Sequence, residues 1–194
     1  MIHYSHKVFK GKEQTMFFIS DIFTTPPESF QTPLQEKVYQ TLGELAVPYE
    51  RVETDEAITM DDCVQINQRL DMRMVKTLFL CNRLQTAFYL FITPGDKPFK
   101  ARDFSAALGV PRVSFAPPEL MAAMLGTKIG AATIFSALLD PEQKIQIVID
   151  REVANKNWYG CSDGTTTGYM KLPTGRILQD FLPRTAHRPA LIEV

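Results

Sequence analysis

The chain of 194 residues is poor in the residues that build metal centres and disulfide frameworks. Its three cysteines include no CxxC pair, which argues against both a disulfide framework and a cysteine zinc site. Its three histidines lie near the two ends of the chain, so a histidine cluster would have to be assembled from the tails. These residues are Cys63, Cys81, Cys161, His3, His6 and His187. We therefore expect reduced thiols, no metal site and no cofactor.

The chain also lacks a large net charge and a long apolar run. The 21 Lys and Arg residues balance 22 Asp and Glu residues, so the global positive field of a duplex-coating protein is absent and any nucleic-acid contact must be local. The longest apolar stretch, Ile129 to Leu139, is far shorter than the roughly 20 residues that a membrane span needs. The N-terminus lacks the succession of a charged region, an apolar region and a cleavage site that defines a signal peptide. We expect a cytoplasmic protein that does not contact a membrane.

Hydrophobic residues make up 45% of the chain, which supplies a core for one ordinary domain. Residues 1–31 are interpreted as an N-terminal extension, because alternating runs on either side of "KGKEQ" predict a hairpin and a breaker cluster follows. Residues 32–194 are interpreted as the main domain. The sequence does not indicate the role of the extension or the oligomeric state.

Helical periodicity begins at Thr32, where Pro33 occupies the first turn and apolar residues recur at helical spacing until Pro48. Thr59 and Asp62 form a capping-box pattern ahead of a second helix, whose apolar face is expected to hold Val64, Ile66 and Leu70. Short helices are also predicted at "ARDFSAALG" and "PPELMAAMLG", each closed by a glycine, and from Pro173 through Leu182.

Strands are predicted at "YERVE", "RVSFA", "KIQIVID", "YMKL" and, as an edge strand, "ALIEV". The runs "VKTLFLC" and "TAFYLFIT" are separated by "NRLQ" and predict a buried hairpin. The segment "WYGCSDGTTTG" is interpreted as a turn-rich loop. Since hairpins and helices mix without strict alternation, we predict an α+β fold rather than a doubly wound sheet.

From about Leu34 to Val194, the order and spacing of these segments resemble the YbaK/ProRS-associated family of prolyl-tRNA editing domains. The resemblance is carried by "LGELAVPYERVE", "MVKTLFL", "FYLFITPGDK", "ARDFSAALGVPRVSFAPPELMAAMLGTKIGAATIFSALLD" and "IQIVID". It implies a mixed, partly barrel-like β-sheet surrounded by short helices. It also implies a free-standing deacylase for mischarged tRNA(Pro), most simply Ala-tRNA(Pro), with the tRNA acceptor end as partner and prolyl-tRNA synthetase as a further candidate partner.

Lys76 is a cation in a run that otherwise has the pattern of a buried strand. Burying an ammonium without a partner costs several kcal/mol, roughly, so its head must reach an anion or a cleft. The resemblance implies that Lys76 lies in the editing pocket and meets the phosphate or ribose of the terminal adenosine. The structural alternative is a lysine at a strand edge that pairs with a nearby carboxylate. Thr77 and Arg73 are neighbouring candidates for substrate binding.

Gly126 and Gly130 in "LGTKIGAATIF" leave backbone amides free of side-chain cover, and fixed amides can stabilise the oxyanion of ester hydrolysis. The resemblance implies that Gly130 lines the aminoacyl pocket and is a catalytic candidate. Gly126 is better explained as a helix C-cap.

The loop from Gly160 to Gly168 departs from the family pattern, in which many members carry a His-Pro pair and then an Asn. The corresponding positions here are Gly160, Cys161 and Gly164, which leaves the substrate specificity open. Asp163 is a catalytic candidate because it could supply a replacement polar group. The remaining candidates for substrate binding in this loop are Gly160, Cys161, Ser162, Gly164, Thr165 and Thr166.

Cys161 also suggests a nucleophile, but no histidine lies nearby in sequence to lower its pKa, and an inert thiol is the simpler interpretation. The expected mechanism is attack by a positioned water, assisted by the ribose hydroxyl of the tRNA and by backbone amides. Besides hydrolysis of some other small ester or amide, which a tRNA-free substrate assay would expose, two alternatives stay open. One is a deacylase for tRNA mischarged with serine or cysteine, and the other is a non-catalytic tRNA-binding or regulatory protein of the same fold.

Overall fold

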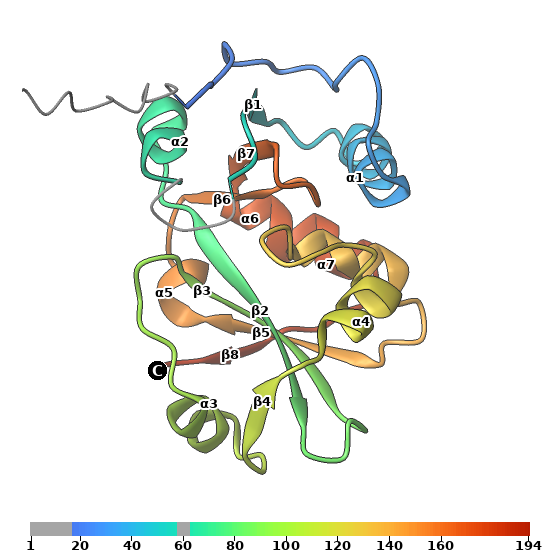
Figure 1. Ribbon diagram of the computed structural model, residues 1–194, viewed down its shortest axis with the longest axis vertical. Coiled ribbons are helices and arrows are strands. Elements are labelled where there is room, and N and C mark those ends of the chain that lie inside the picture. Colours follow the sequence, from blue (N-terminus) through green and yellow to red (C-terminus); the bar gives the residue numbers. More distant parts are fainter. Residues whose placement is uncertain (1–16, 58–62) are drawn as a thin grey trace, which may run out of the picture.

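The computed structural model describes residues 17–57 and 63–194, which form two open β-sheets surrounded by short helices (Figure 1). The five-stranded sheet has the order β4-β2-β3-β5-β8 and the three-stranded sheet the order β1-β7-β6. The strands are β1 (Glu50–Glu53), β2 (Val75–Asn82), β3 (Phe88–Pro94), β4 (Val113–Phe115), β5 (Ile145–Asp150), β6 (Trp158–Ser162), β7 (Gly168–Pro173) and β8 (Ala190–Ile192). The mixed α+β prediction is confirmed, whereas the barrel-like feature is wrong because neither sheet closes within the described residues.

The helices are short, and the chain turns often between them. They are α1 (Pro33–Glu44), α2 (Cys63–Leu70), α3 (Ala101–Leu108), α4 (Pro118–Leu120), η1 (Met121–Leu125, π-helical), η2 (Ile134–Leu139, 3-10), α5 (Arg151–Ala154), α6 (Thr174–Arg176), η3 (Ile177–Phe181, π-helical) and α7 (Leu182–Arg184). Of the described residues, no helix is long and apolar enough to cross a membrane. The same residues contain no cluster of three or more His, Cys, Asp or Glu side chains that could hold a metal ion.

The β2–β3 hairpin is the centre of the larger sheet, as its sequence predicts. Its antiparallel register pairs Lys76 with Thr93 and Phe79 with Leu90. Along its other edge, β3 pairs with β5 in parallel. Successive side chains along a strand point to opposite faces, and apolar residues occupy both sets of positions, so both faces of this sheet are apolar. Phe79 and Leu90 pack into the core beneath the helices, while Leu80 packs on the opposite face with Phe104 of α3.

Helix α1 begins where the capping residue predicts. The Thr32 hydroxyl accepts a hydrogen bond from the Gln35 amide at 3.1 Å, and Pro33 fits the first turn because its missing N–H would have no partner there. Leu34, Val38 and Leu42 are buried on one face of the helix. This face packs α1 against η2 and the core.

Two local predictions differ from the structure, and a third falls on residues that the structure does not describe. Val64 is 50% exposed, so the buried face of α2 is formed by Cys63, Ile66 and Leu70 instead. The supposed loop at "WYGCS" is strand β6, which its small residues conceal in the sequence but which pairs with β7 along its whole length. The capping box at Thr59 and Asp62 lies outside the described residues.

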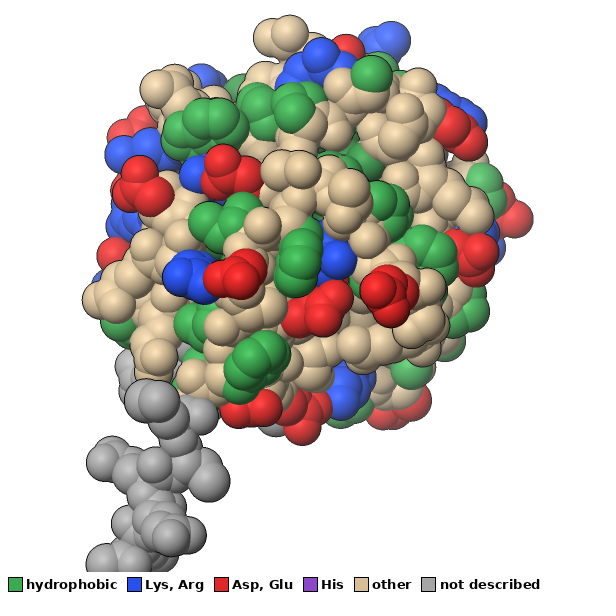
Figure 2. Space-filling model, turned by 90° about the horizontal axis from the view of Figure 1, so that it is seen from above, with side chains coloured by type: hydrophobic (Ala, Val, Ile, Leu, Met, Phe, Trp, Pro, Cys, Tyr) green, Lys and Arg blue, Asp and Glu red, His purple; other side chains and the backbone are tan. Residues whose placement is uncertain are grey.

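Residues 17–31, which we call the strap, cross the top of the smaller sheet from beside α2 to the start of α1 (Figure 1). The strap makes two isolated antiparallel bridges, Ile19 with Thr54 and Phe23 with Arg51. The first arm of the predicted hairpin lies outside the described residues, so the hairpin stays a prediction. Seen from above, this face of the molecule carries hydrophobic and acidic side chains close together (Figure 2).

Candidate active site

A small cavity of about 120 Å³ lies where the two sheets meet. Strands β2 and β6 approach each other here, joined by a parallel bridge between Met74 and Gly160. The turn around Gly130 and the side chain of Tyr169 on β7 help to enclose the space. The cavity is lined by Ala57, Cys63, Met74, Val75, Lys76, Thr77, Gly130, Ala132, Cys161, Ser162 and Tyr169.

Lys76 lies on the wall of this cavity, half-buried at the start of β2. Its ammonium donates a hydrogen bond to the backbone carbonyl of Lys97 in the turn that follows β3. Burial lowers the pKa of Lys76, and the nearby negative charge of Asp96 opposes that shift. The ammonium therefore donates to a neutral carbonyl and lies near one carboxylate. Its positive charge stays available to a ligand.

The turn that holds Lys76 is itself fixed by ion pairs. Lys97 contacts the buried carboxylate of Asp150 at 2.8 Å, and Arg73 contacts Asp96 and Glu152, each at 2.5 Å. The Asp96 hydrogen bond raises the pKa of Arg73, and that same bond lowers the pKa of Asp96. Arg73 does not line the cavity, so its place in the structure is that of a brace for the turn.

Gly130 lies at the rim, in an exposed turn with φ of +88°. Such a conformation favours glycine because a Cβ would be strained there. The turn is held by the Ala131 amide, which donates to the Lys128 carbonyl at 3.0 Å, and by Thr127, whose hydroxyl donates to the Ala131 carbonyl at 3.2 Å. Gly126, by contrast, ends η1 with φ of +63° and does not line the cavity, as expected of a helix cap.

Cys161 and Ser162 close the inner end of the cavity, and neither has the environment of a nucleophile. Burial raises the pKa of the Cys161 thiol, and the negative charge of Asp163 adds to the increase, so the thiol is protonated at neutral pH. The Ser162 hydroxyl donates to the Thr165 carbonyl at 2.6 Å and accepts from the Gly164 amide at 3.0 Å. Both side chains shape the wall.

We expect a Cys161→Ala variant to keep its deacylation rate within about twofold, because a buried thiol with a raised pKa supplies almost no thiolate. The rate should be measured on mischarged tRNA, with and without pre-treatment by iodoacetamide. A loss of activity in a variant that retains its melting temperature would instead assign covalent chemistry to Cys161.

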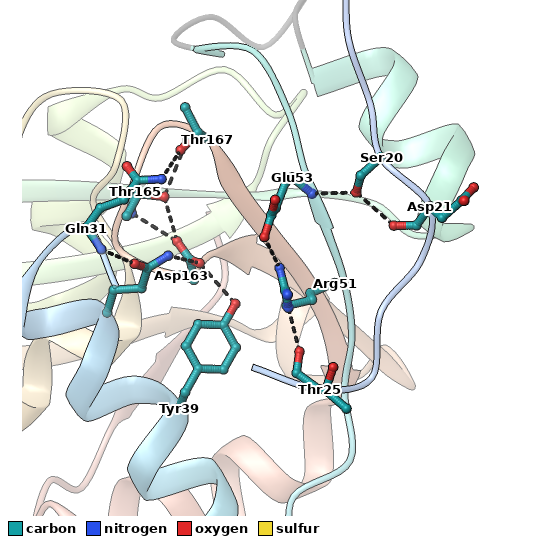
Figure 3. Close-up of polar contacts among 11 residues, drawn as sticks. Ser20, Asp21, Thr25, Gln31, Tyr39, Arg51, Glu53, Asp163, Thr165 and Thr167 are labelled. Carbon is teal, nitrogen blue, oxygen red and sulfur yellow. Dashed lines mark hydrogen bonds and ion pairs between the residues drawn. The ribbon is translucent and has the colours of Figure 1, made fainter. Parts of the chain in front are cut away.

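The segment 163–167 turns away from this cavity. Asp163 is 1% exposed, and its carboxylate accepts hydrogen bonds from Gln35 at 2.8 Å and Tyr39 at 3.0 Å, and from the amide and hydroxyl of Thr165 at 3.1 and 2.8 Å (Figure 3). Burial raises the pKa of Tyr39, so its hydroxyl stays a neutral donor. The Asp163 carboxylate thus ties the β6–β7 connection to α1.

The other candidates of this segment also make structural contacts. The hydroxyl of Thr166 donates to Glu56 at 2.9 Å, and Glu56 pairs with Lys128 at 2.6 Å across the rim. Gly164 has φ of +98°, and a Cβ there would lie 3.0 Å from Leu34. At Gly160 a Cβ would lie 2.5 Å from the sulfur of Met72. A side chain at position 160 would therefore collide with Met72, just before β2, unless the Met72 side chain moved.

The structure brings some predicted site residues together and separates the rest. Lys76, Thr77, Gly130, Cys161 and Ser162 share the cavity, whereas the other candidates do not line it. The latter are Arg73, Gly160, Asp163, Gly164, Thr165 and Thr166. The sequence reasoning missed the other lining residues, which are Ala57, Cys63, Met74, Val75, Ala132 and Tyr169.

Most of the lining residues that the sequence analysis did not name are apolar. In sequence, only their closeness to the start of a strand or to a glycine turn could have indicated them. Met74 precedes Lys76 at the strand position that faces the same side, which is the one local signal available. Tyr169 is buried, and its hydroxyl donates to the Ala57 carbonyl at 2.7 Å, so the two lining residues hold each other in place. An ammonium at one wall, glycine backbone at the rim and an apolar interior together suit a small ester whose polar part points outwards.

Comparisons with known proteins identify relatives of the whole domain. A model of the aminoacyl-tRNA editing domain matches residues 54–178. The prolyl-tRNA editing protein ProX of Acetoanaerobium sticklandii is 24% identical over 123 residues, which cover 63% of this chain and 75% of that protein.

Two solved structures share the fold. A proposed trans-editing enzyme for prolyl-tRNA synthetase superposes with a TM-score of 0.60 at 17% identity, covering 85% of this chain and 99% of that one. A protein described only as hypothetical gives 0.63 at 16% identity, covering 80% and 98%. At these identities the two structures support the fold alone.

Proposed function

Because the chain belongs to the aminoacyl-tRNA editing domain family, we propose that it hydrolyses the ester bond of mischarged tRNA, with Ala-tRNA(Pro) as its substrate. Its likeness to a prolyl-tRNA editing protein and to a proposed trans-editing enzyme supports the choice of tRNA(Pro). The partner would be the acceptor end of the tRNA, released by prolyl-tRNA synthetase.

The observation that carries this proposal is the cavity of about 120 Å³ with Lys76 on its wall and Gly130 at its rim. Pockets that enclose a whole drug-sized ligand are about 300 to 1,000 Å³, so this one suits only a small group. An alanyl group would enter while the tRNA stays outside. A synthetic site built for proline cannot strongly reject alanine, because one or two missing methylenes change binding by only about 1 to 3 kcal/mol, and a second, smaller site repairs the error.

The residues suggest a mechanism based on placement. The Lys76 ammonium would bind the phosphate or ribose of the terminal adenosine and so fix the ester in the cavity mouth. Backbone amides of the turn at Gly130 would face the carbonyl oxygen, where negative charge develops as water attacks. The terminal ribose hydroxyl would assist that water. Cys161 and Ser162 take no covalent part, because one is a protonated thiol and the other is engaged with backbone.

A second candidate is a deacylase for tRNA mischarged with serine or cysteine. It is favoured by one observation, which is that Thr77 and Ser162 add polar groups to a wall that is otherwise apolar. A small polar side chain could be accommodated there as well as alanine. A non-catalytic tRNA-binding role is the remaining alternative. Measured deacylation activity distinguishes it from both deacylase candidates.

The decisive experiment is a deacylation panel with tRNA(Pro) charged with alanine, serine, cysteine or proline. We expect release of alanine well above the spontaneous rate and no release of proline, since the cavity is small. Preferred release of serine or cysteine would favour the second candidate. If no ester is cleaved but the charged tRNA still binds, the chain is a binding protein and the proposal fails.

A further inference from the structure

A second cavity, of about 390 Å³, lies beneath the strap. Its walls come from the strap, α1, β1 and the connection between β6 and β7. The family match begins at residue 54, so the strap and the β1 side chains of this cavity precede the matched region. The volume falls within the range of about 300 to 1,000 Å³ that small-molecule sites occupy.

The two cavities lie on opposite faces of the smaller sheet. Strand register pairs Val52 with Tyr169 and Tyr169 with Ser162, and this face borders the candidate active site. Arg51 and Glu53 flank Val52, so their side chains point to the other face, where they line the second cavity. A ligand there would not compete for the space around Lys76.

Arg51 is the central group of this second cavity, and only 6% of its side chain is exposed. Its Nε donates to the Thr25 carbonyl at 2.6 Å and its Nη1 to Glu53 Oε1 at 2.7 Å (Figure 3). The rings of Phe23 and Tyr39 lie 4.9 and 6.0 Å from the guanidinium carbon. The aromatic contacts and the two hydrogen bonds hold the guanidinium in one orientation.

The Arg51–Glu53 ion pair has unused capacity on both members. Among residues 17–57 and 63–194, the structure gives no partner to Arg51 Nη2 or to Glu53 Oε2. Nearby amides are already engaged, since Gln35 donates to Asp163 and Gln31 donates to Thr167 at 2.8 Å. The free donor and the free acceptor therefore belong to the two members of one ion pair, and the amide groups of Gln31 and Gln35 on the same wall already have partners.

This arrangement selects by charge. Arg51 shares the lining with three carboxylates, those of Glu28, Glu53 and Asp163, so a phosphate or another simple anion would meet net negative charge. A simple cation would meet the guanidinium. A ligand that carries both charges a few bonds apart complements the ion pair, with its carboxylate on Arg51 Nη2 and its ammonium on Glu53 Oε2.

We propose that the cavity beneath the strap binds a free zwitterionic α-amino acid, held through both charges by the Arg51–Glu53 pair. Phe23, Pro26 and Pro27 form an apolar part of the lining, which suits an uncharged side chain on that amino acid. The inference does not rest on deacylation, because the binding needs no tRNA.

The test is calorimetric titration of the full chain with a panel of free L-amino acids that includes alanine, proline, leucine and phenylalanine. At least one should bind. Its N-acetyl and carboxamide derivatives, which each lack one charge, should bind at least about tenfold more weakly, because each loses a charge-assisted hydrogen bond. These derivatives test the charges without altering the protein.

Variants then locate the site. Glu53→Gln should weaken binding at least about tenfold, since it removes the acceptor for the ammonium. Glu50→Gln is the matched control, because Glu50 belongs to the same strand but pairs with Lys171 at 2.6 Å and lies outside the cavity. Binding should survive Glu50→Gln and also Lys76→Ala, and melting curves should verify that each variant is folded.

Several results would overturn the inference. No binding by any amino acid of the panel would do so, as would equal binding of the charge-blocked derivatives. Loss of binding in Lys76→Ala with retention in Glu53→Gln would move the amino acid to the candidate active site. Cytidine, adenosine or inorganic phosphate binding with sensitivity to Glu53→Gln, while amino acids do not bind, would assign a different ligand class.

Discussion

A Lys76→Ala variant is expected to deacylate Ala-tRNA(Pro) at least about tenfold more slowly than the unaltered chain. A hydrogen bond from a charged donor contributes about 1.5 to 3 kcal/mol, and each 1.4 kcal/mol, roughly, corresponds to a factor of ten in rate. The ammonium lies on the cavity wall, and among the residues that the structure describes its hydrogen-bond partner is a neutral carbonyl, so its charge is available to the substrate. Single-turnover deacylation measures the effect.

Lys144→Ala is the matched control for this experiment. Lys144 is an exposed lysine whose ammonium pairs with Glu142 on its own turn, and it does not line the cavity. Its replacement should leave the rate unchanged. Turnover by Lys76→Ala equal to that of Lys144→Ala would remove Lys76 from the site and with it the mechanism proposed above.

An Asp163→Ala variant is expected to lower the free energy of unfolding by about 3 kcal/mol or more. Asp163 is 1% exposed and accepts four hydrogen bonds, which come from Gln35, Tyr39 and Thr165. Without the carboxylate, these donors, which belong to buried side chains, would lose their partner. Urea denaturation monitored by tyrosine and tryptophan fluorescence would measure the loss.

Asp55→Ala provides the comparison, because within the described residues its exposed carboxylate accepts one hydrogen bond, from the Phe18 amide at 2.9 Å. Its cost should stay within about 1 kcal/mol. If Asp163→Ala proves as stable as Asp55→Ala while deacylation collapses, the carboxylate acts in catalysis, as the sequence hypothesis holds. If Asp163→Ala loses stability but the folded variant keeps its deacylation rate, the carboxylate is a structural link between α1 and the β6–β7 connection.

Much of the fold could be predicted because strong local signals coincide with tertiary structure. Thr32 and Pro33 mark the start of α1 through capping chemistry that needs no other part of the chain. The β2–β3 hairpin is apolar on both faces, since both faces of its sheet are covered. Strand β6 escaped prediction because glycine, cysteine and serine carry little strand propensity, and its pairing with β7 decides the conformation.

The candidate site was harder to predict, for a physical reason. Lys76 stands out in sequence because a charge in a buried strand needs an explanation, whereas Tyr169 and Ala57 resemble ordinary core residues. They reach the cavity only because β6, which pairs with β7, lies beside the start of β2 and brings the two sheets together. Polarity drew attention to Asp163 and Thr165, yet these side chains satisfy one another on the opposite face.

The cavity beneath the strap lay beyond sequence reasoning altogether. Arg51 and Glu53 appear in sequence as the alternating charges of an ordinary exposed strand. Their meaning depends on the strap, whose Phe23 covers the guanidinium from a position 28 residues earlier in the chain. A contact of this kind has no local periodicity from which it could be inferred.

The two outer strands of the larger sheet bear on how the protein avoids aggregation. Each has three residues, and each displays an exposed apolar side chain, Phe115 on β4 and Leu191 on β8. Long, flat edges recruit further strands from other molecules, but Pro111 and Pro117 flank β4 and Pro189 precedes β8. A proline on each side limits β4 and a proline at its start limits β8, so each short edge offers another chain few unpaired backbone groups from which to extend the sheet.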